Sequence, residues 1–122
     1  VAEVKALFEL PVIKAVPISG ADDVEKARAY EDVADRLMFD ACPPEGASRP
    51  GGNALAFDWG LIRDRHWRLP WFLAGGLDAD NVAEAVGASG ARAVDVSSGV
   101  EDAPGQKSPD KIRAFLEAVA GL

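Results

Sequence analysis

Cysteine and histidine are nearly absent from this sequence of 122 residues, which contains one of each. A single cysteine excludes a disulfide bond within the chain and is typical of a reducing compartment. One cysteine and one histidine also leave no cluster with the spacing of metal ligands, so we expect no metal site. No apolar run approaches the ~18–20 residues of a membrane-spanning helix, and no export signal opens the sequence. These absences predict a cytoplasmic protein.

Basic residues are scarce relative to acidic ones, with 13 Lys and Arg against 20 Asp and Glu and a net charge of −7. Surfaces that bind nucleic acid or anionic membranes are normally basic, so we expect neither partner. The acidic balance still allows a small phosphorylated substrate, because backbone N–H groups can hold a phosphate without nearby Lys or Arg. With 48% hydrophobic residues and no linker, the chain is typical of one globular α/β domain.

Short apolar runs recur along the chain, each followed by an amphipathic stretch. The predicted strands are Val12–Val16, Leu37–Ala41, Phe72–Gly75 and Ala93–Ser97. Helices are predicted at Ala2–Leu10, Asp22–Tyr30, Asp58–His66 and Asp80–Val86, with a last helix that has Ser108 as its cap and Pro109 at its first position. Most strands are nearly continuous apolar runs, which indicates burial on both faces.

This order of elements predicts parallel strands joined by right-handed helical crossovers. Either a small open sheet or half of a (βα)8 barrel fits it. A complete barrel needs about 250 residues, roughly twice this length. Because the chain also opens within a predicted helix, we expect half of a barrel.

Acidic side chains stand where reacting groups gather in parallel α/β folds, near the C-terminal ends of strands. Asp40 ends the second predicted strand beside apolar residues, a setting that favours the protonated carboxyl of a general acid, although a turn cap fits the position too. Asp95 lies within the fourth predicted strand and either faces a polar site or forms a structural ion pair. Lys14 either pairs with such an acid or extends outward.

Small residues follow the third and fourth predicted strands. Gly75 and Gly76 would let the backbone approach a phosphate closely, although a Gly-Gly pair is also an ordinary tight turn. Ser97, Ser98 and Gly99 form a second turn rich in donors. Turns after strands 7 and 8 hold phosphate in (βα)8 barrels, so these five residues are the predicted phosphate site.

Other conspicuous features of the sequence indicate a loop or packing rather than a further reacting group. The long irregular stretch from Cys42 to Ala54 is typical of a functional loop. Cys42 has no histidine placed to activate it, and we interpret His66 as a surface or packing residue. The tryptophans are expected to pack between helix and sheet, at Trp59, Trp67 and Trp71.

At the predicted strand ends the sequence resembles the phosphoribosylanthranilate isomerase family. The motifs that carry the resemblance are Leu37-Met38-Phe39-Asp40, Gly51-Gly52, Phe57-Asp58-Trp59, Leu73-Ala74-Gly75-Gly76-Leu77, Asn81-Val82, the string from Ala93 to Glu101, Pro104-Gly105-Gln106-Lys107 and Asp110-Lys111-Ile112. They cover essentially the whole chain, and the string DVSSGVE from Asp95 to Glu101 is the most specific. The resemblance implies a TIM-barrel fold in which residues 1–122 are the C-terminal half of a single domain, strands 5 to 8.

The resemblance also implies a reaction, the Amadori rearrangement of N-(5′-phosphoribosyl)anthranilate to the 1′-deoxyribulose form in tryptophan biosynthesis, without cofactor or metal. It implies that Asp40 is the general acid and that Asp95 contacts the sugar hydroxyls. Gly52 is a further expected substrate contact. The two small-residue turns would hold the phosphate.

One departure limits what this chain can do by itself. The family's general base is a cysteine in a Lys-x-Cys-Gly motif at the end of strand 1, and no such motif occurs here. Cys42 lies in the wrong position to replace it. We therefore expect no appreciable catalysis by the chain alone. Its unpaired strand edges predict pairing with the N-terminal half of the barrel or self-association. Two alternatives stay open: a non-catalytic half barrel that binds phosphorylated ligands, and another phosphate-binding barrel enzyme such as an indole-glycerol-phosphate synthase.

Overall fold

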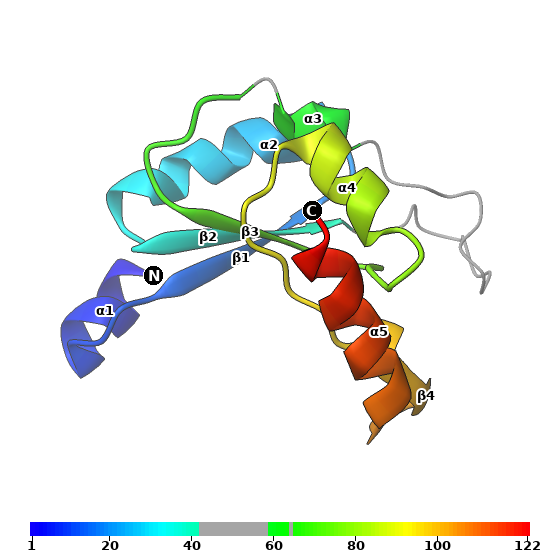
Figure 1. Ribbon diagram of the computed structural model, residues 1–122. Helices are drawn as coiled ribbons and strands as arrows, with labels where there is room; N and C mark the ends of the chain where they lie inside the picture. Colours follow the sequence, from blue (N-terminus) through cyan, green and yellow to red (C-terminus); the bar gives the residue numbers. More distant parts are fainter. Residues whose placement is uncertain (42–58, 64) are drawn as a thin grey trace.

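The computed structural model describes residues 1–41, 59–63 and 65–122 (Figure 1). Its helices are α1 (Ala2–Phe8), α2 (Ala21–Ala27), α3 (Gly60–Arg63), α4 (Val82–Ser89) and α5 (Pro109–Ala120), with 3-10 turns η1 (Arg28–Asp32) and η2 (Ser98–Val100). Its strands are β1 (Ile13–Ile18), β2 (Arg36–Ala41), β3 (Trp71–Ala74), β4 (Glu101–Ala103) and β5 (Gln106–Lys107). The predicted alternation of helix and strand is confirmed from α1 to α4, and the predicted last helix is α5.

Parallel pairing joins β1, β2 and β3 in that order, so the C-terminal ends of the strands meet at one edge. Helices α2, α3 and α4 lie over one face of this sheet (Figure 1). Apolar side chains fill the space between the two layers. They include Ile18, Leu37, Phe39 and Leu73 from the strands and Val24, Ile62 and Val82 from the helices.

The opposite face of the sheet has no helix over it in the described part of the chain. Residues of β1 alternate accordingly: Val16 and Ile18 are buried, whereas Ala15 and Pro17 are exposed. The expectation of strands covered on both faces is therefore wrong for β1, since the described helices cover only one side. Asp40, which is opposite Pro17 in the register, lies on the uncovered face.

The predicted fourth strand is reduced to a single bridge between Leu73 and Val94. Leu73 donates its amide to the Ala93 carbonyl at 2.9 Å, and Asp95 donates to the Leu73 carbonyl at 2.8 Å. Pairing stops there because β3 ends at Ala74, and Gly75 follows with a φ of 94°. The four predicted parallel strands are therefore three strands and one bridge.

Two local features differ from the sequence-based expectations. Helix α3 covers only Gly60–Arg63 of the expected Asp58–His66, and residues 42–58 lie outside the described part. The antiparallel hairpin of β4 and β5 was not predicted. Its turn contains Pro104 followed by Gly105 with a φ of 79°, the arrangement of a type II turn.

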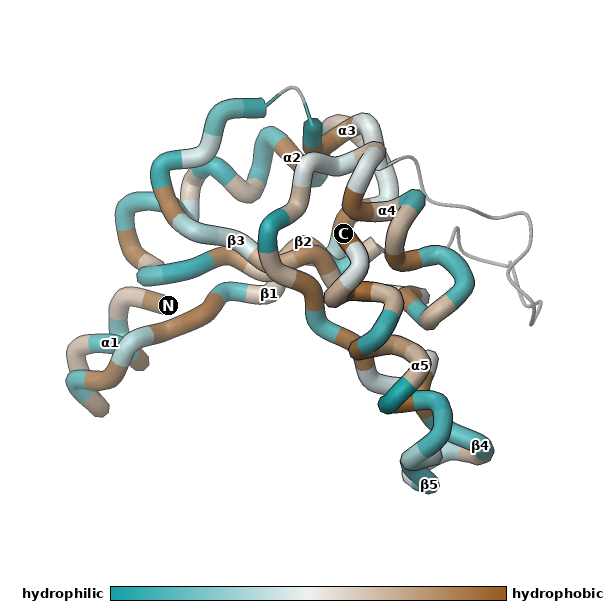
Figure 2. The backbone as a smooth tube through the Cα atoms, viewed as in Figure 1, coloured by the Kyte–Doolittle hydropathy of each residue, from teal (hydrophilic) through white to brown (hydrophobic). Residues whose placement is uncertain are grey.

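Exposed apolar side chains gather on the first and last helices, which lie at opposite ends of the molecule in Figure 1. Figure 2 shows apolar segments continuing from β1 into α1, where Leu7 is 74% exposed. On α5, Leu116 is 61% exposed. No helix in the described residues is long and apolar enough to cross a membrane.

Candidate functional site

Asp40 is the penultimate residue of β2, and its half-buried side chain lies on the uncovered face of the sheet. Gly75, at the end of the neighbouring strand, approaches it closely. A Cβ built on Gly75 would collide with Asp40 Oδ1 and with the backbone of Ala41. The absence of a side chain at Gly75 therefore allows the turn after β3 to lie directly against the carboxylate.

Asp95 follows the single bridge at Val94. Alternation along the strand direction puts it on the same face as Asp40 and Ala74, since Val94 faces the same side as its bridge partner Leu73. The side chain is exposed and forms no ion pair with any described residue. The described part of the chain therefore offers Asp95 no partner for a structural ion pair.

The two turns predicted to hold phosphate are in contact. Gly99 packs so closely on the backbone of Leu77 that an added Cβ would collide with the Leu77 carbonyl oxygen and lie 3.2 Å from Asp78 Cα. Gly76 differs, because a Cβ there would meet nothing described within 4 Å. The turn after β3 and the turn around Ser97, Ser98 and Gly99 thus form one surface, with open space beside Gly76.

Hydrogen bonds organise the first of these turns. Asp78 Oδ1 accepts from the amides of Asp80 at 2.8 Å and Asn81 at 2.9 Å, just before α4 begins. The Asn81 side chain donates to the Gly76 carbonyl at 2.8 Å and accepts from the Asp78 amide at 2.8 Å. Asn81 was not among the site residues predicted from the sequence.

Lys107 organises the second turn from the β4–β5 hairpin. Its Nζ donates to the Ser97 carbonyl at 3.0 Å, to Ser97 Oγ at 3.2 Å and to Glu101 Oε2 at 2.5 Å. The hydrogen bond from Lys107 holds the pKa of Glu101 below its ordinary value. Lys107 was not among the predicted site residues, and the signal that could have found it is its position just after the Pro104-Gly105 turn.

Other predicted candidates lie away from this edge or outside the described residues. Lys14 lies on the helix-covered side of β1, 4.9 Å from the centre of the Tyr30 ring, and pairs with neither Asp40 nor Asp95. His66 is exposed, as expected. Gly52 and Cys42 lie outside the described residues.

The tryptophans confirm the packing interpretation. Trp59 is buried in the core cluster, and Trp67 and Trp71 pack against this cluster. The ring centre of Phe39 lies 4.8 Å from that of Trp67 and 5.3 Å from that of Trp71. Within the described residues, no group of three or more His, Cys, Asp and Glu side chains is arranged to hold a metal ion.

Comparisons with known proteins agree on one family. The sequence matches N-(5′phosphoribosyl)anthranilate (PRA) isomerase over residues 2–118. The N-(5′-phosphoribosyl)anthranilate isomerase of Paramagnetospirillum magneticum is 58% identical over 121 residues, which are 99% of this chain and 56% of that protein. The crystal structure of phosphoribosyl anthranilate isomerase from Thermotoga maritima is similar with a TM-score of 0.78 and 40% identity, over 98% of this chain and 56% of that one. A phosphoribosyl anthranilate isomerase in complex with reduced 1-(o-carboxyphenylamino)-1-deoxyribulose 5-phosphate is similar with a TM-score of 0.74 and 37% identity, over 98% of this chain and 53% of that one.

The chain thus spans about half the length of the curated relatives it matches and about half of the solved structures. Its three parallel strands and their covering helices are a corresponding share of a TIM-barrel fold. Because the family match extends from residue 2 to residue 118, the chain belongs to the N-(5′-phosphoribosyl)anthranilate isomerase family.

Proposed function

We propose that residues 1–122 are the C-terminal (βα)4 portion of a single TIM-barrel domain of phosphoribosylanthranilate isomerase. This portion supplies the general acid and the phosphate site of the Amadori rearrangement. The observation that carries the proposal is the contact of Gly75 with the Asp40 carboxylate, which joins the proposed acid to the proposed phosphate turn at one edge of the sheet.

Asp40 acts first in the proposed mechanism. Its carboxyl group donates a proton to the furanose ring oxygen of N-(5′-phosphoribosyl)anthranilate. The bond between C1′ and that oxygen then breaks, and the anthranilate nitrogen lone pair forms the C=N bond of a protonated Schiff base. A carboxyl on the uncovered face of the sheet suits this step, since no described helix separates it from a substrate there.

A base completes the reaction by removing the proton from C2′. The resulting enolamine tautomerises to the 1′-deoxyribulose product, so atoms and charge balance without an oxidant or a metal. The described residues offer no group at the strand ends in the role of the family's cysteine base. The base therefore comes from another part of the barrel, and the chain alone does not turn over substrate.

The remaining site residues bind the substrate. The turn of Gly75 and Gly76 and the turn of Ser97, Ser98 and Gly99 hold the phosphate through small residues that leave room for a ligand beside the backbone. The mutual contact of these turns at Leu77 and Gly99 supports a shared site. Asp95, on the same face as Asp40, contacts the sugar hydroxyls. Gly52 remains a proposed substrate contact outside the described residues.

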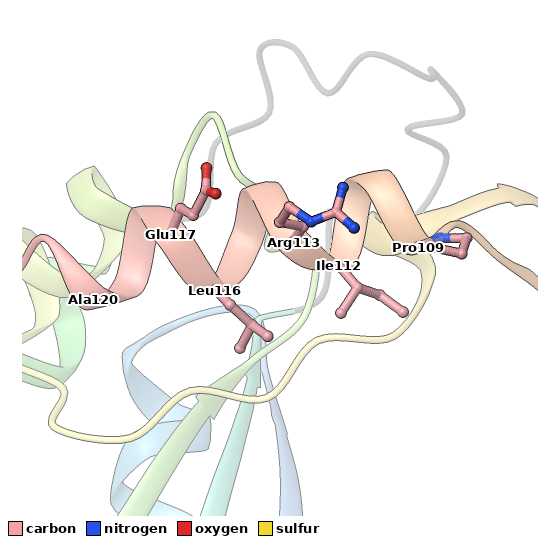
Figure 3. Close-up of a pocket in the computed structure, with 6 residues that line it drawn as sticks. All are labelled: Pro109, Ile112, Arg113, Leu116, Glu117 and Ala120. Carbon is pink, nitrogen blue, oxygen red and sulfur yellow. The ribbon is translucent and has the colours of Figure 1, made fainter.

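The proposed partner is the N-terminal portion of the barrel, which would account for the other half of the relatives' length. Figure 3 shows Ile112 and Leu116 projecting from the same side of α5. Pro109 and Ala120 complete this apolar stripe, and Arg113 and Glu117 lie along one flank of it. Together with exposed apolar residues on α1 at the opposite end, the stripe provides two apolar ends that a closed barrel would bury.

An assay of phosphoribosylanthranilate turnover, followed by the change in anthranilate fluorescence, tests the proposal. The chain is assayed alone and mixed with the N-terminal portion of the Paramagnetospirillum magneticum relative, expressed separately. Activity should arise only in the mixture and fall by about 100-fold or more in Asp40→Asn, the scale of a lost general acid. Asp80→Asn is the matched control, because it removes an exposed carboxylate beside the phosphate turn.

The outcomes separate the competing functions. Turnover by the chain alone would contradict the missing base. Phosphate binding without turnover in the mixture would favour a non-catalytic binding half barrel. Assembly of the chain with itself in place of the N-terminal portion would contradict the proposed partner.

A further inference from the structure

We propose that Asn81 is a positioning residue that holds the two phosphate turns in register with one another. The inference rests on the proposed phosphate site. Asn81 hydrogen-bonds to the first of these turns, and its side chain is directed back toward Gly76 and Asp78.

Asn81 occupies the N-cap position of α4, yet its side chain makes no capping hydrogen bond to that helix. Both polar groups of the side chain turn backward instead. Nδ2 donates to the Gly76 carbonyl at 2.8 Å, and Oδ1 accepts from the Asp78 amide at 2.8 Å. An asparagine that only started a helix would direct its oxygen to an amide of the first helical turn. The Asn81 amide group is therefore used on the preceding turn.

Each of these bonds fixes a whole peptide unit. A trans peptide is planar, and its C=O and N–H point in opposite directions. With the Gly76 carbonyl directed at Asn81, the Leu77 N–H of the same peptide points away from Asn81. This bond also holds the turn at Gly76, where φ is 69° and an added Cβ would meet nothing described within 4 Å.

The second bond reaches the other turn. The Asp78 N–H points to Asn81, so the Leu77 carbonyl in the same peptide points the other way. That carbonyl oxygen is the atom that lies against Gly99, at the point where the second turn packs on the first. One side chain thus orients both the open peptide beside Gly76 and the contact that joins the two turns.

Two variants test the inference. Asn81→Ala removes both bonds, whereas Asn81→Asp keeps the acceptor for Asp78 and loses the donor to Gly76. Asp80→Ala is the matched control, since it truncates the neighbouring exposed side chain of the same segment. The probe is inorganic phosphate, titrated into the 122-residue chain. Its dissociation constant is measured from the amide NMR shifts of Gly76 and Ser98, and the unfolding midpoint of each variant is measured in parallel.

We expect Asn81→Ala to weaken phosphate binding about tenfold, the effect of roughly one or two net hydrogen bonds. Asn81→Asp should weaken it as well, and Asp80→Ala should bind like the wild type. The Asp78 amide should exchange with solvent faster in Asn81→Ala and remain protected in Asn81→Asp. A weakened helix start alone would shift the unfolding midpoint without this difference in Asp78 amide exchange between the two variants.

Equal phosphate affinity in the wild type and both Asn81 variants would overturn the inference while leaving the phosphate site intact. A wild-type chain that binds no phosphate would overturn the proposed site. In that case amide exchange still tests the role of Asn81, and unchanged protection of the Asp78 amide in Asn81→Ala would refute it. Should Asn81→Ala fail to fold, Asn81→Asp decides the question through the Gly76 shift.

Discussion

Replacing Gly75 by alanine tests how closely the turn after β3 is held against the proposed acid. Gly75 has a φ of 94°, and an added Cβ would collide with Asp40 Oδ1 while lying 2.5 Å from the Ala41 nitrogen and 2.8 Å from the Ala41 oxygen. Two of these three atoms belong to the backbone at the end of β2. Rotating a side chain therefore cannot relieve the collision, and the strand or the turn must move.

The size of the effect has two parts. A non-glycine residue in the left-handed region costs about 1–2 kcal/mol. Forcing a methyl group into packed space costs about 1–3 kcal/mol more. Gly75→Ala should therefore lower the free energy of unfolding by about 2–5 kcal/mol, a large share of the total of a small domain.

Substitutions at two other glycines distinguish the backbone cost from the packing cost. Gly76 has a φ of 69° but open space around it, so Gly76→Ala should incur only the backbone cost of about 1–2 kcal/mol. Gly87 lies within α4 with nothing described within 4 Å of an added Cβ. Gly87→Ala should raise the free energy of unfolding by about 0.5–1 kcal/mol, because alanine favours the helix.

Urea unfolding followed by circular dichroism and tryptophan fluorescence measures all three variants against the wild type. The expected order of midpoints, from highest to lowest, is Gly87→Ala, wild type, Gly76→Ala and Gly75→Ala. If Gly75→Ala and Gly76→Ala were equally stable, the collision with Asp40 and Ala41 would cost nothing. The close approach of the turn to the acid would then be refuted.

Two further predictions concern buried and paired carboxylates. Glu31 is 7% exposed and accepts from the amides of Arg68 at 2.5 Å and Leu69 at 3.3 Å, so Glu31→Ala should lower the free energy of unfolding by about 2–3 kcal/mol in urea. Stability unchanged within experimental error would contradict this. The Lys107 hydrogen bond lowers the pKa of Glu101 from 4.5, so its stabilisation is present above that pH and is lost as the pH falls through the folded-state value. Between pH 5 and pH 3, Glu101→Gln should therefore lose less stability than the wild type, as measured by thermal unfolding. Parallel pH profiles of the two proteins would show that the ion pair of Glu101 with Lys107 is not linked to folding.

Strand positions could be read from the sequence because apolar runs and their burial coincide. Leu37–Ala41 was predicted and Arg36–Ala41 is observed, since Leu37 and Phe39 have core positions that only one register satisfies. The prediction of a fourth strand was wrong because strand pairing depends on residues distant in the sequence. Ala93–Ser97 has the apolar content of a strand, but its pairing depends on the length of β3, which ends where Gly75 adopts a positive φ.

The proposed site was predictable only as a set of residue types at one edge. Strand order implied that Asp40 and Gly75 lie near each other, but their direct contact depends on the register of β2 and β3. Asn81 was missed because the predicted helix Asp80–Val86 includes it as an ordinary helical residue, whereas its side chain turns back to Gly76. Lys107 was missed because its partner Ser97 is reached only through a hairpin that brings the lysine back.

These contacts indicate which functions this chain should have without the N-terminal portion of the proposed barrel. Gly75 against Asp40, Gly99 against Leu77 and Asn81 between Gly76 and Asp78 are all interactions within this chain. The geometry of the proposed phosphate turns therefore should not depend on the other portion, and we expect the chain to bind phosphate by itself but not to turn over substrate. Addition of the N-terminal portion should then change the turnover rate far more than the affinity for inorganic phosphate. A phosphate affinity that rose in parallel with turnover would mean that the turns are organised only when the barrel closes.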